Sequence, residues 1–251
     1  MPQPNIKPQI YAGIDGCKAG WLVVQGISLE EFSISVAPNL SAIASLTMAI
    51  ALIDIPVGLP DAEPRPSDQL VRRLLGHPRS SSVFSAPTRP AIEAPDYPSA
   101  NQAQRAAQGK GLSKQSWNLA PRIRDADAFI REHQLQKLVR ESHPELCFAA
   151  FNGGSAMQHR KKDAEGKQER LGVLLRFWPE ARTAFIEADS RFPRGQVQPD
   201  DILDAMVLFL AATELVARLV SYPDPPPVDE KGLPMHILAP DPRFDKPRPS
   251  V

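Results

Sequence analysis

The sequence has no net charge, no long apolar run and no leader-like start, and each absence excludes a class of protein. Lysine plus arginine and aspartate plus glutamate both number 29. A uniformly basic nucleic-acid-binding surface is therefore excluded, and any anion-binding surface must be local. No apolar run approaches the ~18 residues of a membrane span, and the first residues show no basic segment followed by an apolar core. We expect neither a membrane segment nor a secretory signal.

Cysteine is scarce, and two common sequence signatures of catalysis are missing. Cys17 and Cys147 are the two cysteines, too few for a disulfide framework or a closely spaced set of zinc ligands. We expect both to be small buried hydrophobic side chains in a protein of the reducing cytoplasm. The sequence has no Gly-x-x-x-x-Gly-Lys-Ser/Thr phosphate loop and no Gly-x-Ser-x-Gly elbow, so neither signature indicates the chemistry.

Apolar content and the distribution of proline indicate how the chain is organised. Hydrophobic residues make up 42% of the 251 residues, enough for a sizeable core in one domain. The 27 prolines are concentrated at 56–98 and in the tails, where they limit helices to short pieces. We predict a single domain over residues 1–240, with a helical insertion at about 60–136, followed by an extended tail at 241–251.

The order of secondary-structure signals predicts an α/β fold. Runs typical of strands occur at residues 9–15, 21–24, 31–36, 49–55 and 141–151. Helical patterns follow at 165–190 and 200–220, the second apolar nearly all round and therefore buried. We predict a mixed five-stranded sheet of order 3-2-1-4-5, with the first three strands antiparallel and helices on both faces. This is the order of elements of the ribonuclease-H-like fold.

Acidic residues interrupt apolar segments, where an unpaired carboxylate is costly. Asp15 ends the first strand, and Asp54 lies within the fourth. Asp204 lies inside the long apolar helix, with Asp201 one turn earlier on the same face. If these four meet at one edge of the sheet, they would hold Mg²⁺ or Mn²⁺, and two such ions would activate water against a phosphodiester. Capping of the helix by Asp201 and a turn role for Asp15 are the structural alternatives.

A second group of candidates surrounds Glu145, which the strand at 141–151 would carry past the site. His143 could relay protons or bind phosphate, or it could be structural. Basic side chains suited to phosphate contacts are Lys18, Lys161, Lys162 and Arg170, and the insertion adds Arg79, Lys114 and Arg122. We predict Glu145 as a fifth site acid, and the histidine and the first four of these basic residues as substrate contacts, although such charges are usually only solvated.

Six ordered motifs together resemble one protein family. They are GIDGCKAGW at 13–21, IDIPVGLP at 53–60, SSVFSAP at 81–87, SHPELCF at 142–148, the 161–170 segment with Lys161, Lys162, Gly166 and Arg170, and DDILDA at 200–205. Over about residues 10–240 the chain resembles a bacterial and archaeal family long catalogued as a domain of unknown function and predicted to be a ribonuclease-H-like nuclease. The resemblance implies that fold and a metal-dependent nuclease activity. It supports as site acids Asp15, Asp54, Glu145, Asp201 and Asp204.

The leading hypothesis is therefore phosphodiester hydrolysis at a carboxylate-bound two-metal site, on nucleic acid or a small phosphoester. Two alternatives stay open. One is a nucleotide-binding phosphotransferase or ATPase of the actin-like superfamily, whose members begin with a similar Gly-Ile-Asp-Gly turn. The other is a non-catalytic member that binds a small molecule and keeps the acids for structural reasons. The sequence leaves the oligomeric state undetermined.

Overall fold

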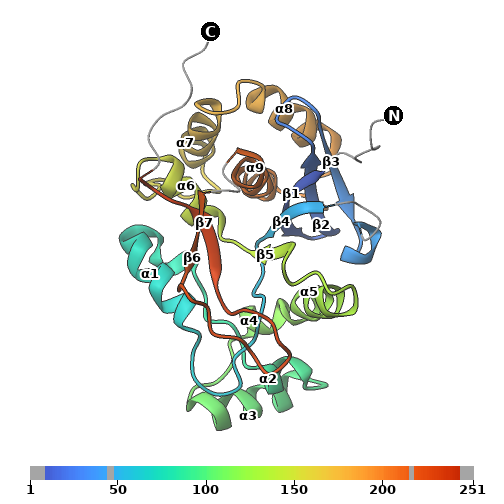
Figure 1. The fold of residues 1–251 in the computed structure, drawn as a ribbon, viewed down its shortest axis with the longest axis vertical. Helices are drawn as coiled ribbons and strands as arrows, with labels where there is room; N and C mark the ends of the chain where they lie inside the picture. The colour runs from blue at the N-terminus through green and yellow to red at the C-terminus, as the bar shows by residue number, and fades with distance from the viewer. Residues whose placement is uncertain (1–8, 44–47, 215–217, 244–251) are drawn as a thin grey trace, which may run out of the picture.

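A mixed sheet of five strands forms the centre of the computed structural model, which describes residues 9–43, 48–214 and 218–243 (Figure 1). The strands are β1 (Ile10–Cys17), β2 (Gly20–Gly26), β3 (Phe32–Ala37), β4 (Met48–Ile53) and β5 (Val139–Glu141). Their order is β3-β2-β1-β4-β5. β2 pairs antiparallel with β1 and β3, whereas β4 pairs parallel with β1 and β5. The predicted α/β class and sheet order are confirmed.

Helices fill the two long connections of the chain. Between β4 and β5 lie α1 (Pro66–Arg79), α2 (Arg89–Glu93), α3 (Tyr97–Gln108), α4 (Lys114–Asn118) and α5 (Ala120–Glu132). After β5 come α6 (Pro144–Phe151), α7 (Ala164–Leu175), α8 (Ala181–Arg191) and α9 (Pro199–Glu214). Short 3-10 turns lie at Leu40–Ile43 and Ser80–Ser82. Residues 60–136, all of them described, contain helices and loops and no strand.

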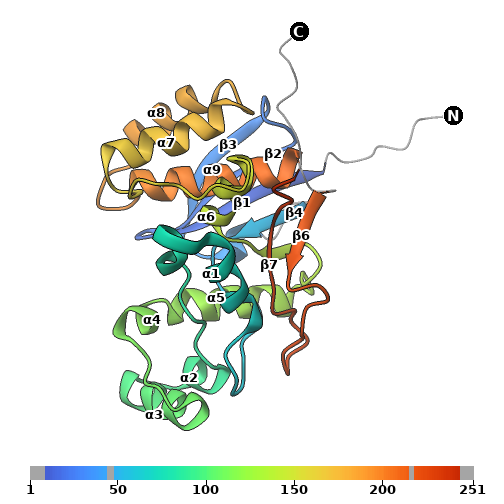
Figure 2. The ribbon, with the colours of Figure 1, turned by 90° about the vertical axis from the view of Figure 1, so that its left-hand side faces the viewer.

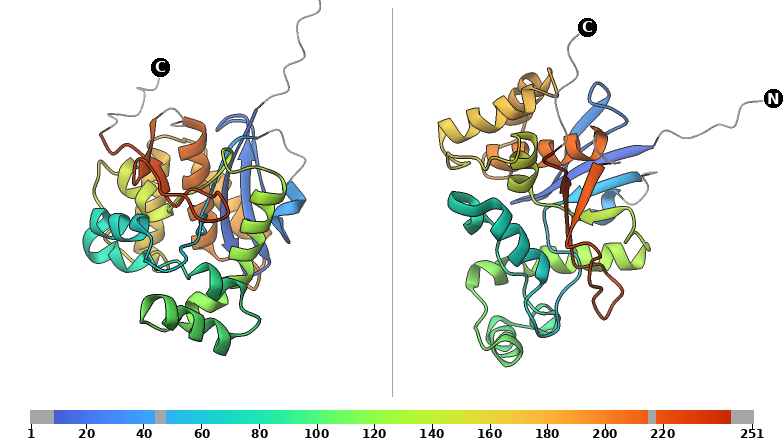
Figure 3. Two further views of the ribbon diagram at one scale, coloured as in Figure 1. Left: turned by 60° about the horizontal axis from the view of Figure 1, so that its bottom comes forward. Right: turned by 60° about the vertical axis from the view of Figure 1, so that its left-hand side comes forward.

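Helical layers cover both faces of the sheet, as predicted. In Figure 2, α9 lies directly on the sheet with α7 and α8 on its far side, whereas α5 lies against the opposite face. α5 packs Ile123, Phe129 and Ile130 into the same cluster as Ile14 and Ile53 of the sheet. The helices α2, α3 and α4 extend away from the sheet (Figure 3).

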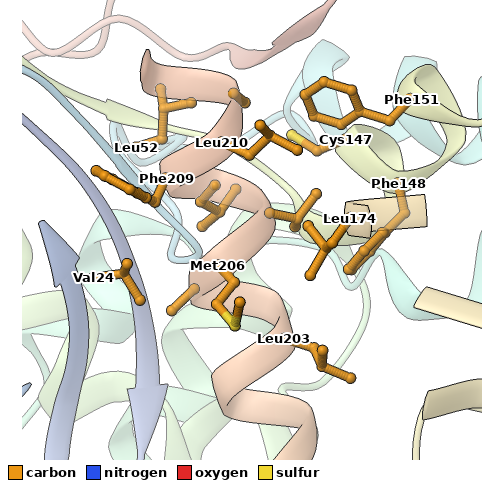
Figure 4. Close-up of a cluster of buried hydrophobic side chains, with 14 of the residues drawn as sticks. Val24, Leu52, Cys147, Phe148, Phe151, Leu174, Leu203, Met206, Phe209 and Leu210 are labelled. Carbon is orange, nitrogen blue, oxygen red and sulfur yellow. The ribbon is translucent and has the colours of Figure 1, made fainter. Parts of the chain in front are cut away.

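The central position of α9 follows from its sequence, which is apolar on every side from residue 205 to residue 212. Its residues from 205 to 212 are all buried. One side of the helix meets Val24 and Leu52 of the sheet. The other meets Cys147, Phe148 and Leu174 of α6 and α7 (Figure 4). A helix enclosed in this way holds its few polar side chains at fixed places.

The structure corrects the predicted strand at 141–151. β5 ends at Glu141, and Pro144–Phe151 is the buried helix α6. Pro144 stands in the first turn, where a missing backbone N–H costs nothing and the fixed φ suits a helix. An apolar run of this length does not by itself distinguish a buried helix from a strand. Glu145 therefore lies in the first turn of a helix and not on the fifth strand.

The predicted helix at 200–220 is also too long. α9 is described to Glu214, residues 215–217 lie outside the described part, and Leu219–Tyr222 forms strand β6. β6 pairs antiparallel with β7 (Ile237–Pro240) in a separate two-stranded sheet. Long-range pairing thus overrides the helical pattern of this end. Most of the predicted tail, 244–251, lies outside the described residues.

No helix within the described ranges is both long and apolar enough to cross a membrane.

Candidate metal centre

Asp15 and Asp54 meet because their strands are neighbours and run in parallel. The backbone N–H of Asp54, just after β4, donates to the carbonyl of Ile14 at 2.9 Å, which continues the β1–β4 pairing by one residue. Ala12 and Ile14 pack on the α5 side of the sheet. Because side chains alternate along a strand, Asp15 points to the other side, towards α9.

Asp204 reaches the same point because α9 crosses β1 at very close range. A Cβ on Gly13 would lie 2.2 Å from the carbonyl oxygen of Ala205 and 2.2 Å from the backbone nitrogen of Phe209. Glycine is therefore required at residue 13, since any side chain there would push the helix away. The close approach brings the carboxylate of Asp204, in the first half of α9, beside that of Asp15.

The three carboxylates form one group. Each of Asp15, Asp54 and Asp204 offers one oxygen, and these oxygens all lie within 4.8 Å of one another. Asp15 and Asp204 are 6% and 1% exposed, and Asp54 is partly buried. Burial raises the pKa of Asp15 well above its usual range, and repulsion from Asp54 and Asp204 raises it further. Burial also raises the pKa of Asp54, with Asp204 adding to the effect. A cation bound among the three carboxylates would relieve this repulsion.

Lys161 supplies one positive charge to this group. Its Nζ donates to Asp204 Oδ2 at 2.6 Å and lies 3.7 Å from Asp200 Oδ2. The nearby carboxylates, Asp204 first, raise the pKa of Lys161 and keep it protonated. Among the described residues, no other basic side chain is ion-paired with any of the three acids.

The loop that carries Lys161 is held by buried contacts. The guanidinium of Arg170, which is 0% exposed, donates to the carbonyls of His159 and Gly166 at 3.2 and 2.9 Å. A Cβ on Gly166 would lie 1.8 Å from the carbonyl oxygen of Arg160, so only glycine permits the fold of this loop. Arg170 also binds Glu145 Oε1 through Nε and Nη2. It therefore positions the Lys161 loop from inside the protein.

Several buried polar atoms of the site have no hydrogen-bond partner among the described residues. They are Asp204 Oδ1, Glu145 Oε2 and His143 Nδ1. A buried acceptor without a donor costs about 1–3 kcal/mol, so these atoms are free to bind a ligand that enters the site. The residues fit Mg²⁺ or Mn²⁺, which prefer carboxylate oxygens. Two ligands 2.0–2.1 Å from one Mg²⁺ lie at most about 4.2 Å apart, so the three carboxylates would move closer together to share one ion.

A cavity of about 600 Å³ opens beside the acids. Its walls come from the loop after α1, the start of α6, and the Lys161 loop. Predicted site residues in the lining are Asp54, His143, Glu145, Lys161, Lys162 and Asp204. The lining also includes Arg79, Ser81, Ser82, Phe84, Gln115, Pro144, Arg160 and Asp163. A volume of this size accepts a small ligand or a short piece of a polymer.

Four other predicted site residues do not line the cavity: Asp15, Lys18, Arg170 and Asp201. Asp201 Oδ2 accepts the backbone N–H of Gln198 at 2.8 Å and so caps the start of α9. Burial nevertheless raises the pKa of Asp201 to about 6. Lys18 is exposed in the β1–β2 turn and does not line the cavity. Arg170 is buried against Glu145, which leaves it no face for a substrate.

The cavity wall includes basic side chains that sequence reasoning considered, Arg79 and Lys162, and one that it missed, Arg160. Arg79 is anchored by the carbonyls of Met157 and Gln158, at 2.7 and 2.8 Å. Arg160 and Lys162 lie exposed at the wall without an ion pair among the described residues. The sequence could have indicated Arg160 as a further phosphate contact, because it directly precedes Lys161 and Lys162. Phe84, which is 37% exposed, lies in the SSVFSAP motif of the family resemblance, but no role in the site was predicted for it.

A second buried charge cluster supports the loop after β4. Arg65 is 2% exposed and donates to both oxygens of Glu141, at 2.7 and 2.8 Å. It also donates to Asp68 Oδ1, at 2.6 Å from Nη2 and 3.1 Å from Nε. The backbone N–H of Val57 and that of Ala86 donate to Glu141 Oε2 and Asp68 Oδ2. This network, which we call the Arg65 network, joins the segments that flank the cavity.

The fold and the site together define an α/β protein with a group of three carboxylates at its centre. Among the described residues, Lys161 is the one basic side chain that is ion-paired with this group. The chain belongs to the family described as "Protein of unknown function (DUF429)", whose family model matches residues 13–228. No curated protein and no solved structure matches the chain.

Proposed function

We propose that this protein hydrolyses phosphodiesters with a divalent cation, Mg²⁺ or Mn²⁺, held by Asp15, Asp54 and Asp204. One observation carries the proposal: three acids from three separate segments offer oxygens within 4.8 Å of one another, beside a cavity. Asp204 Oδ1 supports it independently, since this oxygen is buried without a partner among the described residues and is free to bind a ligand. The sheet order, which is that of the ribonuclease-H-like fold, supports a nuclease as the class.

The proposed chemistry divides between the acids and the basic wall. A bound ion would supply activation of water and stabilisation of charge on the phosphate. Asp15, Asp54 and Asp204 hold and orient that ion. Lys162 and Arg160 attract the phosphate, because they are exposed cations without ion-pair partners in the described parts of the chain. The substrate is a nucleic acid or a small phosphoester.

His143 and Glu145 border the cavity beside the acids. His143 Nε2 lies 3.4 Å from the carbonyl oxygen of Ser82, and its Nδ1 has no partner among the described residues. We assign it to proton transfer at the phosphate. Glu145 keeps one oxygen on Arg170 and leaves Oε2 without a partner in the same part of the chain. It can accept a hydrogen bond from a donor such as water at that oxygen.

The test is a melting experiment with Mn²⁺ at constant ionic strength. An ion that binds only the folded state at a hundredfold excess over its dissociation constant stabilises by about 2.7 kcal/mol. For a domain of this size that is roughly 5–10 °C. We expect this shift in wild type and in Asp201→Asn, which keeps the helix cap, and no shift in Asp54→Asn. No shift in wild type at millimolar Mn²⁺ would overturn the proposal.

Activity assays then separate the competing functions. Mn²⁺-dependent cleavage of oligonucleotides or of bis(p-nitrophenyl) phosphate, lost in Asp54→Asn, supports phosphodiester hydrolysis. Stabilisation by nucleoside triphosphates with release of inorganic phosphate would instead support the actin-like alternative. A protein that binds Mn²⁺ but cleaves none of these substrates would favour the non-catalytic alternative.

A further inference from the structure

The charge balance of the site differs from that expected for a two-metal centre. Two ions 3.5–4 Å apart need carboxylates that bridge and flank both positions. The structure brings oxygens of three acids within 4.8 Å of one another, whereas Asp201 caps α9 and Glu145 is ion-paired with Arg170. A fourth carboxylate, that of Asp200, lies with its Oδ2 3.7 Å from the Nζ of Lys161.

Lys161 stands where additional positive charge is needed. Its ammonium donates to Asp204 Oδ2 at 2.6 Å, and Asp204 Oδ1 is the oxygen left without a partner among the described residues. One carboxylate thus presents one oxygen to the lysine and one to a further cation. An ammonium and a divalent ion on the same carboxylate repel each other, so the lysine disfavours a second ion there.

The position of Lys161 is set by the fold and not by chance contact of a flexible side chain. Hydrogen bonds from Arg170 to the loop backbone, and the close backbone approach at Gly166, hold the loop in place. The Lys161 side chain is 38% exposed, and the residue lines the cavity. Lys161 therefore contacts Asp204 through its ammonium and also borders the cavity.

We propose that the centre takes one divalent cation and that the Lys161 ammonium substitutes for the second. This inference rests on the proposed metal-dependent function. Asp15, Asp54 and Asp204 Oδ1 bind the single ion. Lys161 neutralises Asp204 Oδ2 and contacts the substrate phosphate from the cavity wall. It is a built-in cation that cannot dissociate, unlike a weakly held second metal.

The experiment counts bound Mn²⁺ by isothermal titration calorimetry and by electron paramagnetic resonance of the free ion. Wild type should bind one Mn²⁺. Lys161→Gln should bind the first ion at least about tenfold more tightly, because a neighbouring positive charge is gone, and should bind a second. Lys161→Arg keeps the charge and should bind one ion within about threefold of wild type.

Lys162→Gln is the matched control, since the adjacent lysine is exposed and has no carboxylate partner among the described residues. It should leave the Mn²⁺ count and affinity unchanged. Two ions in wild type, or unaltered count and affinity in Lys161→Gln, would overturn the inference and leave the proposed function standing. Absence of Mn²⁺ binding in every variant would overturn both. If Lys161→Gln fails to fold, the inference can still be rejected. A count of two Mn²⁺ ions in wild type, or loss of Mn²⁺ affinity in Lys161→Arg, would reject it.

Discussion

Two groups of buried charge lie close to the same cavity, and they differ in how completely their atoms are paired. In the Arg65 network, both oxygens of Glu141 and both of Asp68 accept hydrogen bonds. In the acid group, Asp204 Oδ1 has no partner among the described residues, and Asp15 and Asp54 are ion-paired with no base there. Both groups are mostly buried, so burial does not distinguish the Arg65 network from the proposed metal centre. The number of unpaired oxygens next to a cavity does.

The largest effect should come from breaking the paired group. Arg65→Met leaves Glu141 and Asp68 as buried carboxylates without their main partner, and such a change typically costs about 3–5 kcal/mol. We expect a loss of that size in the free energy of unfolding, measured by urea denaturation monitored by circular dichroism. The triple variant Arg65→Met/Glu141→Leu/Asp68→Leu should recover part of it, because no charge is then left unpaired. A neutral effect of Arg65→Met would show that the network adds no stability.

The acid group should respond in the opposite way, with activity lost and stability kept. Asp54→Asn removes one ligand charge, and we expect the metal-dependent hydrolysis rate to fall by at least about 100-fold, beyond the 10–100-fold cost of losing an outer-shell contact. The metal-free variant should melt no lower than wild type, since repulsion among the acids is relieved. Melting curves and initial rates on the same preparation check both parts. A variant that is less stable and still active would assign Asp54 to structure.

The same distinction explains what the sequence could predict. Asp15, Asp54 and Asp204 were identifiable because each interrupts an apolar segment, and a carboxylate there is costly without a purpose. The sheet order was predictable because alternation and apolar runs follow strand geometry. Asp201 fitted the same pattern, yet its side chain caps the helix. Local spacing does not distinguish a helix cap from a ligand.

Long-range pairing was not predictable from the sequence. Arg65 and Glu141 are 76 residues apart, and their bidentate contact depends on how the loop after β4 meets β5. The role of Arg170 was likewise hidden. Its place in the motif indicated a substrate contact, whereas its 0% exposure and its bond to Glu145 make it a support. Local sequence gives the charge of a side chain but not its partner or its exposure.

The pH dependence of stability should distinguish the acid group from the Arg65 network, with an effect smaller than those of the two substitutions above. Burial and repulsion raise the pKa of Asp15 in the folded state above its unfolded value. The folded protein then binds more protons than the unfolded chain, so this residue costs increasing stability as pH rises from about 4 through the raised pKa. In metal-free protein, Asp15→Asn should gain in melting temperature relative to wild type between pH 4 and pH 7. A difference that shrinks with rising pH would indicate a lowered pKa and a paired Asp15.

The smallest effect should come from substituting exposed lysines. A comparison of Lys162 with Lys18 tests whether the cavity wall contacts the substrate. Lys162 lines the cavity and Lys18 does not, although both are exposed and both are sequence-predicted substrate contacts. Each phosphate contact contributes a slope of roughly 0.7–0.9 to the dependence of log affinity on log salt. With single-stranded and duplex oligonucleotides measured by fluorescence anisotropy in Ca²⁺, Lys162→Gln should lower that slope by about one such unit. Lys18→Gln should leave it unchanged, because its side chain lies outside the cavity. An equal decrease of the slope in both variants would mean that the substrate extends over the β1–β2 turn. A decrease in Lys18→Gln alone would place the binding surface away from the cavity wall.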